Sequence, residues 1–152
     1  MKLCLVILLA VLISSCTTSP RISDEGIQQV RASLPAGEDE VKLSRVGIWL
    51  PNSKEFRFTA VEPSIKGVVV LTGKSLVFQR WGGPTGLVTL HYIPYKEMRS
   101  AHMETIGRSG RLVIESVSGR FDSFAVSDGL GELSLGRDTE EMHRVLKTLG
   151  SL

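Results

Sequence analysis

The chain has 152 residues, of which 22% are charged, and its formal net charge at pH 7 is +2. A chain of this length forms one ordinary domain with a sizeable core. The interspersed Lys, Arg, Asp and Glu residues argue against the clustered basic surface that binds nucleic acids. Both cysteines, Cys4 and Cys16, lie near the N-terminus, so the sequence predicts no disulfide in the folded domain.

Residues 1–15 have the three parts of an export signal. Lys2 supplies a positive charge, residues 3–13 form an apolar run, and Ser14 and Ser15 are small. The apolar run is shorter than the roughly 20 residues that a transmembrane helix needs. We therefore predict a cleaved export signal.

The segment Ile13-Ser14-Ser15-Cys16 resembles the lipobox of bacterial lipoproteins, in which an aliphatic and two small residues precede the modified cysteine. The resemblance implies cleavage between Ser15 and Cys16, a diacylglyceryl group on the Cys16 thiol and acylation of the new amine. Two or more acyl chains hold a protein stably on a membrane. Because Thr17 replaces the aspartate of inner-membrane lipoproteins, the resemblance implies the outer membrane, facing the periplasm. An ordinary secretory signal with an incidental cysteine is the alternative.

A short polar tether, residues 16–21, is predicted to precede a short amphipathic helix and linker, residues 22–36. Ile27, Val30 and Leu34 fall on one face of this helix. The helix could pack on the folded domain or lie on the bilayer surface. Three moderate apolar residues favour packing on the domain.

From residue 40 onward the apolar pattern changes to the alternation typical of β-strands. Turn sequences rich in Gly, Pro, Asn and Ser separate the runs. Short strands in this order predict an antiparallel meander, which needs closure or sandwiching to hide its edges. The predicted strands are residues 41–50, 56–60, 67–71, 76–81, 87–93, 100–106, 112–117 and 121–126.

The last segment is predicted to be one amphipathic helix. Asp138 and Glu141 have the spacing of a capping box, and Gly150 follows the last apolar residue. The helix has a single apolar stripe, which must cover part of the preceding sheet. The stripe consists of Met142, Val145, Leu146 and Leu149.

Several strands followed by one amphipathic helix is also the order of elements in pleckstrin-homology-like (PH-like) and GRAM-type domains. Residues 67–78 resemble the central hairpin of the bacterial members, and residues 93–98 resemble the segment that follows it. The resemblance implies a mainly β fold over residues 40–150, an antiparallel PH-like barrel or sandwich of about seven strands. A C-terminal helix caps it, and a short N-terminal helix precedes it. It also implies a scaffold that binds proteins, peptides or lipid headgroups without catalysis.

The residues that usually carry chemistry do not form a recognisable constellation. His91, His102 and His143 lack the spacing of metal ligands, and no serine lies in a Gly-x-Ser-x-Gly motif. The sequence therefore predicts no metal, no cofactor and no enzyme activity.

Two groups of residues are candidates for binding. Aromatic residues could rim a groove, as they often do at partner sites, and arginines could gather near strand ends to bind an anionic headgroup or an acidic partner. The alternatives are aromatic residues that pack in the core and loops, and scattered solvated arginines. The aromatic candidates are Trp81, Tyr92 and Tyr95, with His91 nearby in the chain, and the basic candidates are Arg99, Arg108 and Arg111, with Arg120.

Taken together, these patterns predict a membrane-anchored envelope lipoprotein that acts as a non-catalytic binding or adaptor module. The expected partners are the membrane, through acyl chains on Cys16, and an envelope protein, but no nucleic acid. The alternative is a periplasmic carrier of lipid or another small hydrophobic ligand, which would use the barrel interior or its helix-capped end. An envelope hydrolase is a third hypothesis, for which the sequence nominates no residue.

Overall fold

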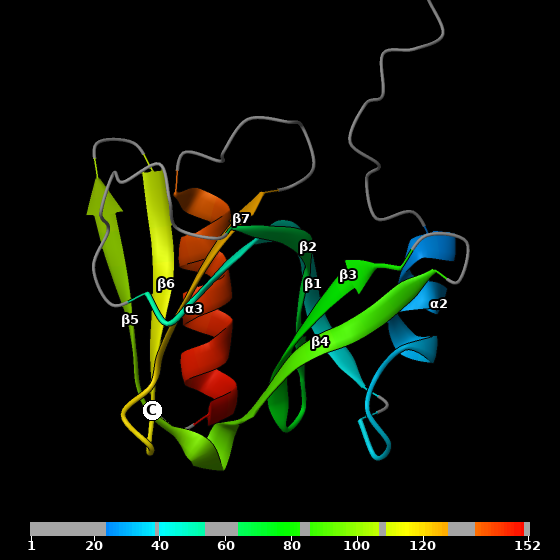
Figure 1. The fold of residues 1–152 in the computed structure, drawn as a ribbon, viewed down its shortest axis with the longest axis horizontal. Coiled ribbons are helices and arrows are strands. Elements are labelled where there is room, and N and C mark those ends of the chain that lie inside the picture. Colours follow the sequence, from blue (N-terminus) through cyan, green and yellow to red (C-terminus); the bar gives the residue numbers. More distant parts are fainter. Residues whose placement is uncertain are drawn as a thin grey trace, which may run out of the picture.

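The computed structural model describes residues 24–38, 40–53, 64–82, 86–106, 109–127 and 136–150. Within these residues, seven antiparallel strands form one sheet between two helices (Figure 1). The predicted signal peptide, the tether, Cys16 and the predicted strand at residues 56–60 lie outside the described residues. The elements are α2 (Asp24–Ala32), β1 (Val41–Pro51), β2 (Ile65–Thr72), β3 (Ser75–Trp81), β4 (Leu87–Pro94), the 3-10 helix η3 (Tyr95–Glu97), β5 (Met98–Ile106), β6 (Ser109–Ser116), β7 (Phe121–Ser127) and α3 (Arg137–Gly150).

The sheet folds back on itself around β1. Its strand order is β4-β3-β2-β1-β7-β6-β5, so β1 joins both halves. Gly47 of β1 pairs with Gly67 of β2 on one side and with Val126 of β7 on the other. A Cβ on Gly67 would lie 2.1 Å from the carbonyl oxygen of Gln79, and a Cβ on Gly47 would lie 2.5 Å from that of Ala125. The two glycines therefore allow the strands to approach closely where the sheet bends.

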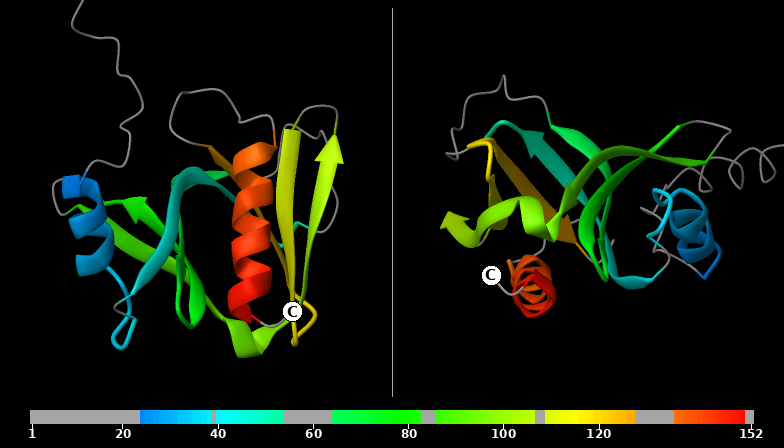
Figure 2. Two further views of the ribbon diagram at one scale, coloured as in Figure 1. Left: turned by 180° about the vertical axis from the view of Figure 1, so that it is seen from behind. Right: turned by 90° about the horizontal axis from the view of Figure 1, so that it is seen from below.

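The inner side of the folded sheet holds the main core, and α3 covers it (Figure 2). Trp49, Phe78 and Phe124 meet there from three different strands. Met142 and Leu146 of α3 are fully buried against them, and Val145 and Leu149 pack at the margin of the same core. The predicted apolar stripe of this helix is therefore confirmed.

The start of α3 differs from the prediction. The helix begins at Arg137, so Asp138 lies inside the first turn and cannot be the N-cap. The chain enters from Gly136, whose φ is +79°. Glu141 accepts a hydrogen bond from Arg45 at 2.8 Å instead of turning back to the helix start. The predicted capping box is wrong because Asp138 lies inside the helix and the Glu141 carboxylate binds Arg45.

The helix α2 covers the outer side of β2, β3 and β4. Val30 is 1% exposed and packs in a second apolar cluster with Val68, Val70, Val77 and Leu87. The side-chain amide of Gln79 also donates a hydrogen bond to the Val30 carbonyl at 3.0 Å. Figures 1 and 2 show α2 beside β3 and β4, in the half of the molecule away from α3. α2 therefore packs against the sheet, which is the alternative that the sequence favoured over a position on the bilayer surface. Neither helix of the described residues has the length and apolar content needed to span a bilayer.

Candidate binding site

The three aromatic candidates do not form one groove. Trp81 ends β3 with 42% of its surface exposed, and Tyr92 on β4 is 40% exposed. Tyr95 lies in the core, where its hydroxyl donates a hydrogen bond to the Thr72 carbonyl at 2.8 Å. Burial, with a smaller contribution from the nearby negative charge of Glu38, raises the pKa of Tyr95 above its usual range. The proposal that Tyr95 rims a surface groove is therefore wrong, because its ring completes the core.

Tyr92 ties the linker after α2 to the sheet. Its hydroxyl donates a hydrogen bond to Glu38 at 3.0 Å, and Thr72 donates a second hydrogen bond to the same carboxylate. Burial and the hydrogen bond to Glu38 raise the pKa of Tyr92. Only the exposed side of the Tyr92 ring is therefore available to a partner.

The basic candidates are also separated. Arg99 binds Glu115 at 2.8 Å and the Val117 carbonyl at 3.0 Å. Arg111 is 2% exposed and forms an ion pair with Glu104 at 2.6 Å. Arg108 lies outside the described residues. The structure does not bring Arg99 and Arg111 together, and Arg111 cannot meet a ligand because it is buried and paired.

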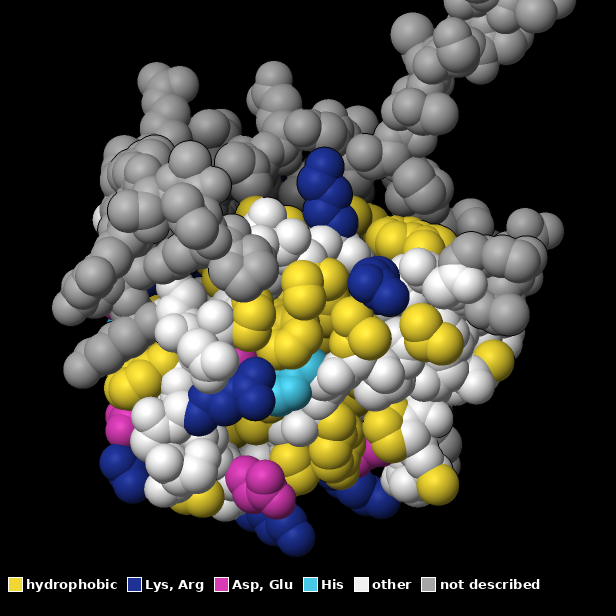
Figure 3. Space-filling model, in the orientation of Figure 1, with side chains coloured by type: hydrophobic (Ala, Val, Ile, Leu, Met, Phe, Trp, Pro, Cys, Tyr) yellow, Lys and Arg dark blue, Asp and Glu magenta, His cyan; other side chains and the backbone are white. Residues whose placement is uncertain are grey.

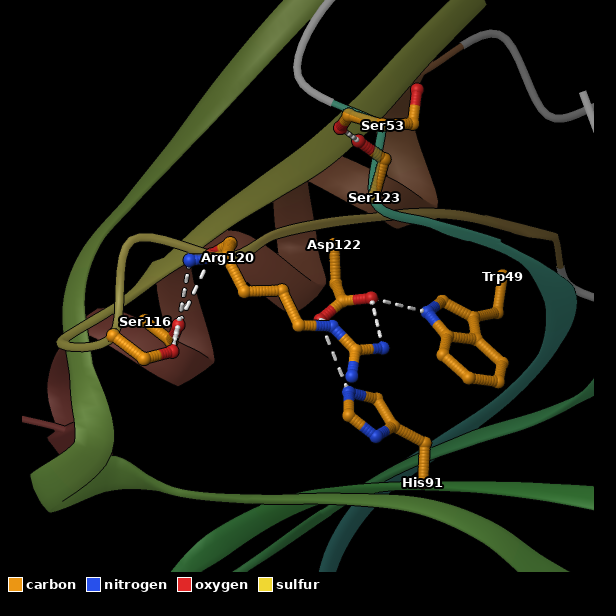
Figure 4. A network of polar contacts seen from close by, with 8 residues as sticks. Trp49, Ser53, His91, Ser116, Arg120, Asp122 and Ser123 are labelled. Atoms are coloured by element: carbon orange, nitrogen blue, oxygen red, sulfur yellow. Dashed lines mark hydrogen bonds and ion pairs between the residues drawn. The ribbon is translucent and has the colours of Figure 1, made fainter.

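A buried carboxylate, Asp122, organises a polar network that includes residues from β1, β4 and β7 (Figure 4). The Trp49 indole N–H donates to one carboxylate oxygen at 2.9 Å, and His91 Nε2 lies 3.2 Å from the other. Arg120 contacts both oxygens at 3.0 Å. The rings of Trp49 and His91 stack with centroids 4.6 Å apart. The network bridges the two halves of the sheet, because β4 and β7 are not neighbours in the strand order.

The surrounding donors keep Asp122 ionised. Burial alone would raise its pKa, but the hydrogen bonds from His91, Trp49 and Arg120 outweigh burial and hold the pKa below its usual value. Hydrogen bonds already engage both oxygens, so the carboxylate is poorly placed to take a proton from a substrate. Within the described part of the chain, no group of three His, Cys, Asp or Glu residues could hold a metal ion.

The sequence patterns place His91 and Arg120 in separate candidate groups and do not point to Trp49 or Asp122. The contacts join residues 73 and 31 positions apart, which no local motif reveals. One signal was present: Asp122 shares the alternation of Phe124 and Val126, so it occupies an inward position of its strand.

The outer edge of β4 is an accessible and largely apolar surface of the described structure. This strand ends the sheet, no described strand pairs with its outer edge, and its sequence has no Asp, Glu, Lys or Arg. Val88, Leu90 and Tyr92 are each 40% exposed along it. In the orientation of Figure 1, hydrophobic side chains gather at the centre of the visible face, with Lys, Arg and His side chains beside them (Figure 3).

The opposite edge of the sheet, formed by β5, is better protected. It carries the charged residues Arg99 and Glu104, and α3 packs against it. His143 of α3 also donates a hydrogen bond to the Ala101 carbonyl at 3.1 Å. Charges and covering elements are the usual means of blocking an edge strand. The two edges therefore differ in their capacity to accept a partner strand.

Solved structures with the same arrangement identify the fold. A domain of an unknown protein from Leishmania infantum aligns with 86% of this chain and 100% of its own, at 17% identity and a TM-score of 0.56. The linker-DH/PH domains of p115-RhoGEF align with 86% of this chain and 35% of their own, at 8% identity and a TM-score of 0.53. The fold is PH-like. Because the sequence identities are low, the similarity concerns the fold alone. No protein-family model and no curated protein matches the sequence.

This finding confirms the predicted fold class, a mainly β PH-like fold. Its described residues form seven antiparallel strands, a C-terminal helix and a short N-terminal helix. Within this fold, the exposed edge of β4 and the Asp122 network lie close together, because His91 belongs to both.

Proposed function

We propose that this protein is a lipid-anchored adaptor of the bacterial cell envelope that holds a protein partner along β4. The proposed anchor is Cys16, acylated after cleavage behind Ser15, with the domain on the periplasmic face of the outer membrane. The lipobox-like segment Ile13-Ser14-Ser15-Cys16 supports this part of the proposal. The PH-like fold supports the binding role.

The uncharged edge of β4 is the observation that carries the proposal. An edge strand presents unpaired backbone N–H and C=O groups, and natural proteins usually protect such edges with charge, bulges or cover. This strand has one irregularity, a register shift opposite Phe78 and Gln79, but no charged side chain. An apolar, uncharged edge is expected where a strand of another chain pairs with it.

The kind of partner follows from the chemistry of this edge. An extended polypeptide segment can pair with the backbone of this edge beyond Leu87, whose carbonyl already accepts a hydrogen bond from Ser33, and apolar side chains of that segment match Leu90. The carrier hypothesis has less support, because Trp49, Phe78 and Phe124 fill the inner side of the described sheet.

The test is crosslinking in cells, followed by mass spectrometry of proteins trapped with a tagged form of this chain. We expect one envelope protein to appear with the anchored form and to be lost with Cys16→Ala. Leu90→Lys should weaken its recovery at least about tenfold, equivalent to about 1.4 kcal/mol, because it places a protective charge on the edge. Thr148→Lys, at an exposed position on α3, is the matched control. Equal recovery with Leu90→Lys and Thr148→Lys would exclude the β4 edge.

A further inference from the structure

The ends of β3 and β4 that flank their connecting loop expose apolar side chains on both faces of the hairpin. Trp81 is 42% exposed and Val88 is 40% exposed. Trp81 pairs with Leu87, whereas Val88 pairs with the exposed residue Arg80. Because side chains alternate along a strand, Trp81 lies on the face covered by α2, and Val88 and Arg80 lie on the other. A large aromatic, an aliphatic and a cationic side chain therefore surround this end of the hairpin.

The same end of the hairpin is bonded to the helix nearest the proposed anchor. Ser33, just after α2, donates its hydroxyl proton to the Leu87 carbonyl at 2.6 Å, and Thr89 donates to the Ser33 carbonyl at 2.6 Å. Cys16 precedes Asp24, the first residue of α2, by eight positions. Eight extended residues span at most about 28 Å. An acyl chain on Cys16 would thus hold α2 and this hairpin close to the bilayer.

We propose that the end of the β3–β4 hairpin rests in the headgroup region of the membrane to which the protein is anchored, with Trp81 as the principal contact. This inference rests on the proposed acylation of Cys16. Tryptophan favours the membrane interface because its ring is apolar and its N–H is polar. Arg80 adds attraction to anionic lipids, and Val88 adds apolar area.

Lipid suits this surface better than a second protein because the anchor does most of the binding. Once the acyl chains hold the domain, a contact of three side chains acts at a high effective concentration, so weak intrinsic affinity is enough. The contact then fixes how the domain faces the bilayer. It leaves Leu90 and the rest of the β4 edge to the proposed protein partner.

The two tryptophans make a direct test. The acylated full-length protein is reconstituted into phosphatidylcholine and phosphatidylglycerol vesicles, with or without bromine on the lipid acyl chains, which quenches nearby indole fluorescence. Trp49 is buried in the core and Trp81 is exposed. The emission of Trp81 is the difference between the wild type and Trp81→Phe, and we expect brominated lipid to quench most of it. The emission of Trp81→Phe comes from Trp49 alone and should stay unchanged.

A second pair of variants tests the contact without altering tryptophan. Val88→Glu should reduce the quenching of Trp81, whereas Val117→Glu, at a residue that is 54% exposed on the β6–β7 turn, should leave it unchanged. Vesicle-bound protein whose Trp81 is not quenched would overturn this inference and leave the anchor standing. Protein that does not float with the vesicles would contradict the anchor, and this inference with it.

Discussion

At the scale of single residues, Asp122 shows how a charge is kept in a nearly water-free position. The carboxylate side chain is 4% exposed, and Trp49, His91 and Arg120 supply hydrogen bonds to its two oxygens. Each donor comes from a different part of the chain. Together, the three donors offset the energetic cost of burying the charge.

Replacing Asp122 with an uncharged residue should make the free energy of unfolding depend less on pH in the acidic range. We expect Asp122→Asn to lower the free energy of unfolding near neutral pH by about 2 kcal/mol, because hydrogen bonds to a charged acceptor are lost. The folded-state pKa of Asp122 lies below its usual value. Its contribution is therefore fully present above the unfolded pKa of about 3.9 and is lost as the pH falls through the folded pKa. Urea unfolding across this pH range measures the difference.

The control is Glu40→Gln, which removes a carboxylate that is 65% exposed and paired with Lys42 at the surface. Exposed pairs of this kind contribute little, so this variant should differ from the wild type by less than about 1 kcal/mol at every pH. A stability gap for Asp122→Asn that is as large in acid as at neutral pH would show that shape, and not charge, explains the role of Asp122.

At the scale of elements, the paired glycines Gly47 and Gly67 let their strands lie unusually close to β7 and β3, respectively. Backbone atoms crowd both positions, so a side chain could fit only if strands moved apart. Strand separation would also disturb the core, since Phe78 lies 2.6 Å from the place a Gly67 Cβ would take. The strands can therefore approach this closely only because both positions lack a side chain.

Gly67→Ala should destabilise the domain strongly. We expect a loss of about 3 kcal/mol in the free energy of unfolding, the upper end of the cost of overpacking. Gly73→Ala is the matched control, because a Cβ at Gly73 would meet only the Glu40 carboxylate at 3.8 Å, and it should change stability by less than about 0.5 kcal/mol. Chemical unfolding of both variants checks this account, and two equally stable proteins would refute it.

The sequence predicted the elements better than their contacts. Alternating apolar residues located the described strands within a few positions, because inward and outward faces of a sheet differ in solvation. The sequence also predicted the apolar stripe of α3 correctly. The capping box failed because Arg45, far away in sequence, competes for Glu141. The sequence favours packing of α2 on the domain, but it could not show where on the sheet the helix packs, because its partners come from β2, β3 and β4.

At the scale of the whole molecule, the two helices divide the surface of the sheet between them. α3 fills the inner side, and α2 covers the outer side near the β3–β4 hairpin. Among the described residues, no strand pairs with the outer edge of β4, and the polar network beneath it joins this strand to the other half of the sheet. The sequence could not predict this site, because strand order decides which strand becomes an edge, and no local pattern encodes strand order.

The central claim is that β4 is where a protein partner binds. The most direct measurement places a photo-crosslinking amino acid at position 90 of the anchored full-length protein in cells, and at position 148 on α3 in a parallel sample. Leu90 is 40% exposed on the open edge, and Thr148 is exposed on a helix away from it. We predict that one envelope protein is trapped from position 90 through an extended segment of its chain, and that position 148 does not trap it. Equal adducts from both positions, or none from position 90, would contradict the account.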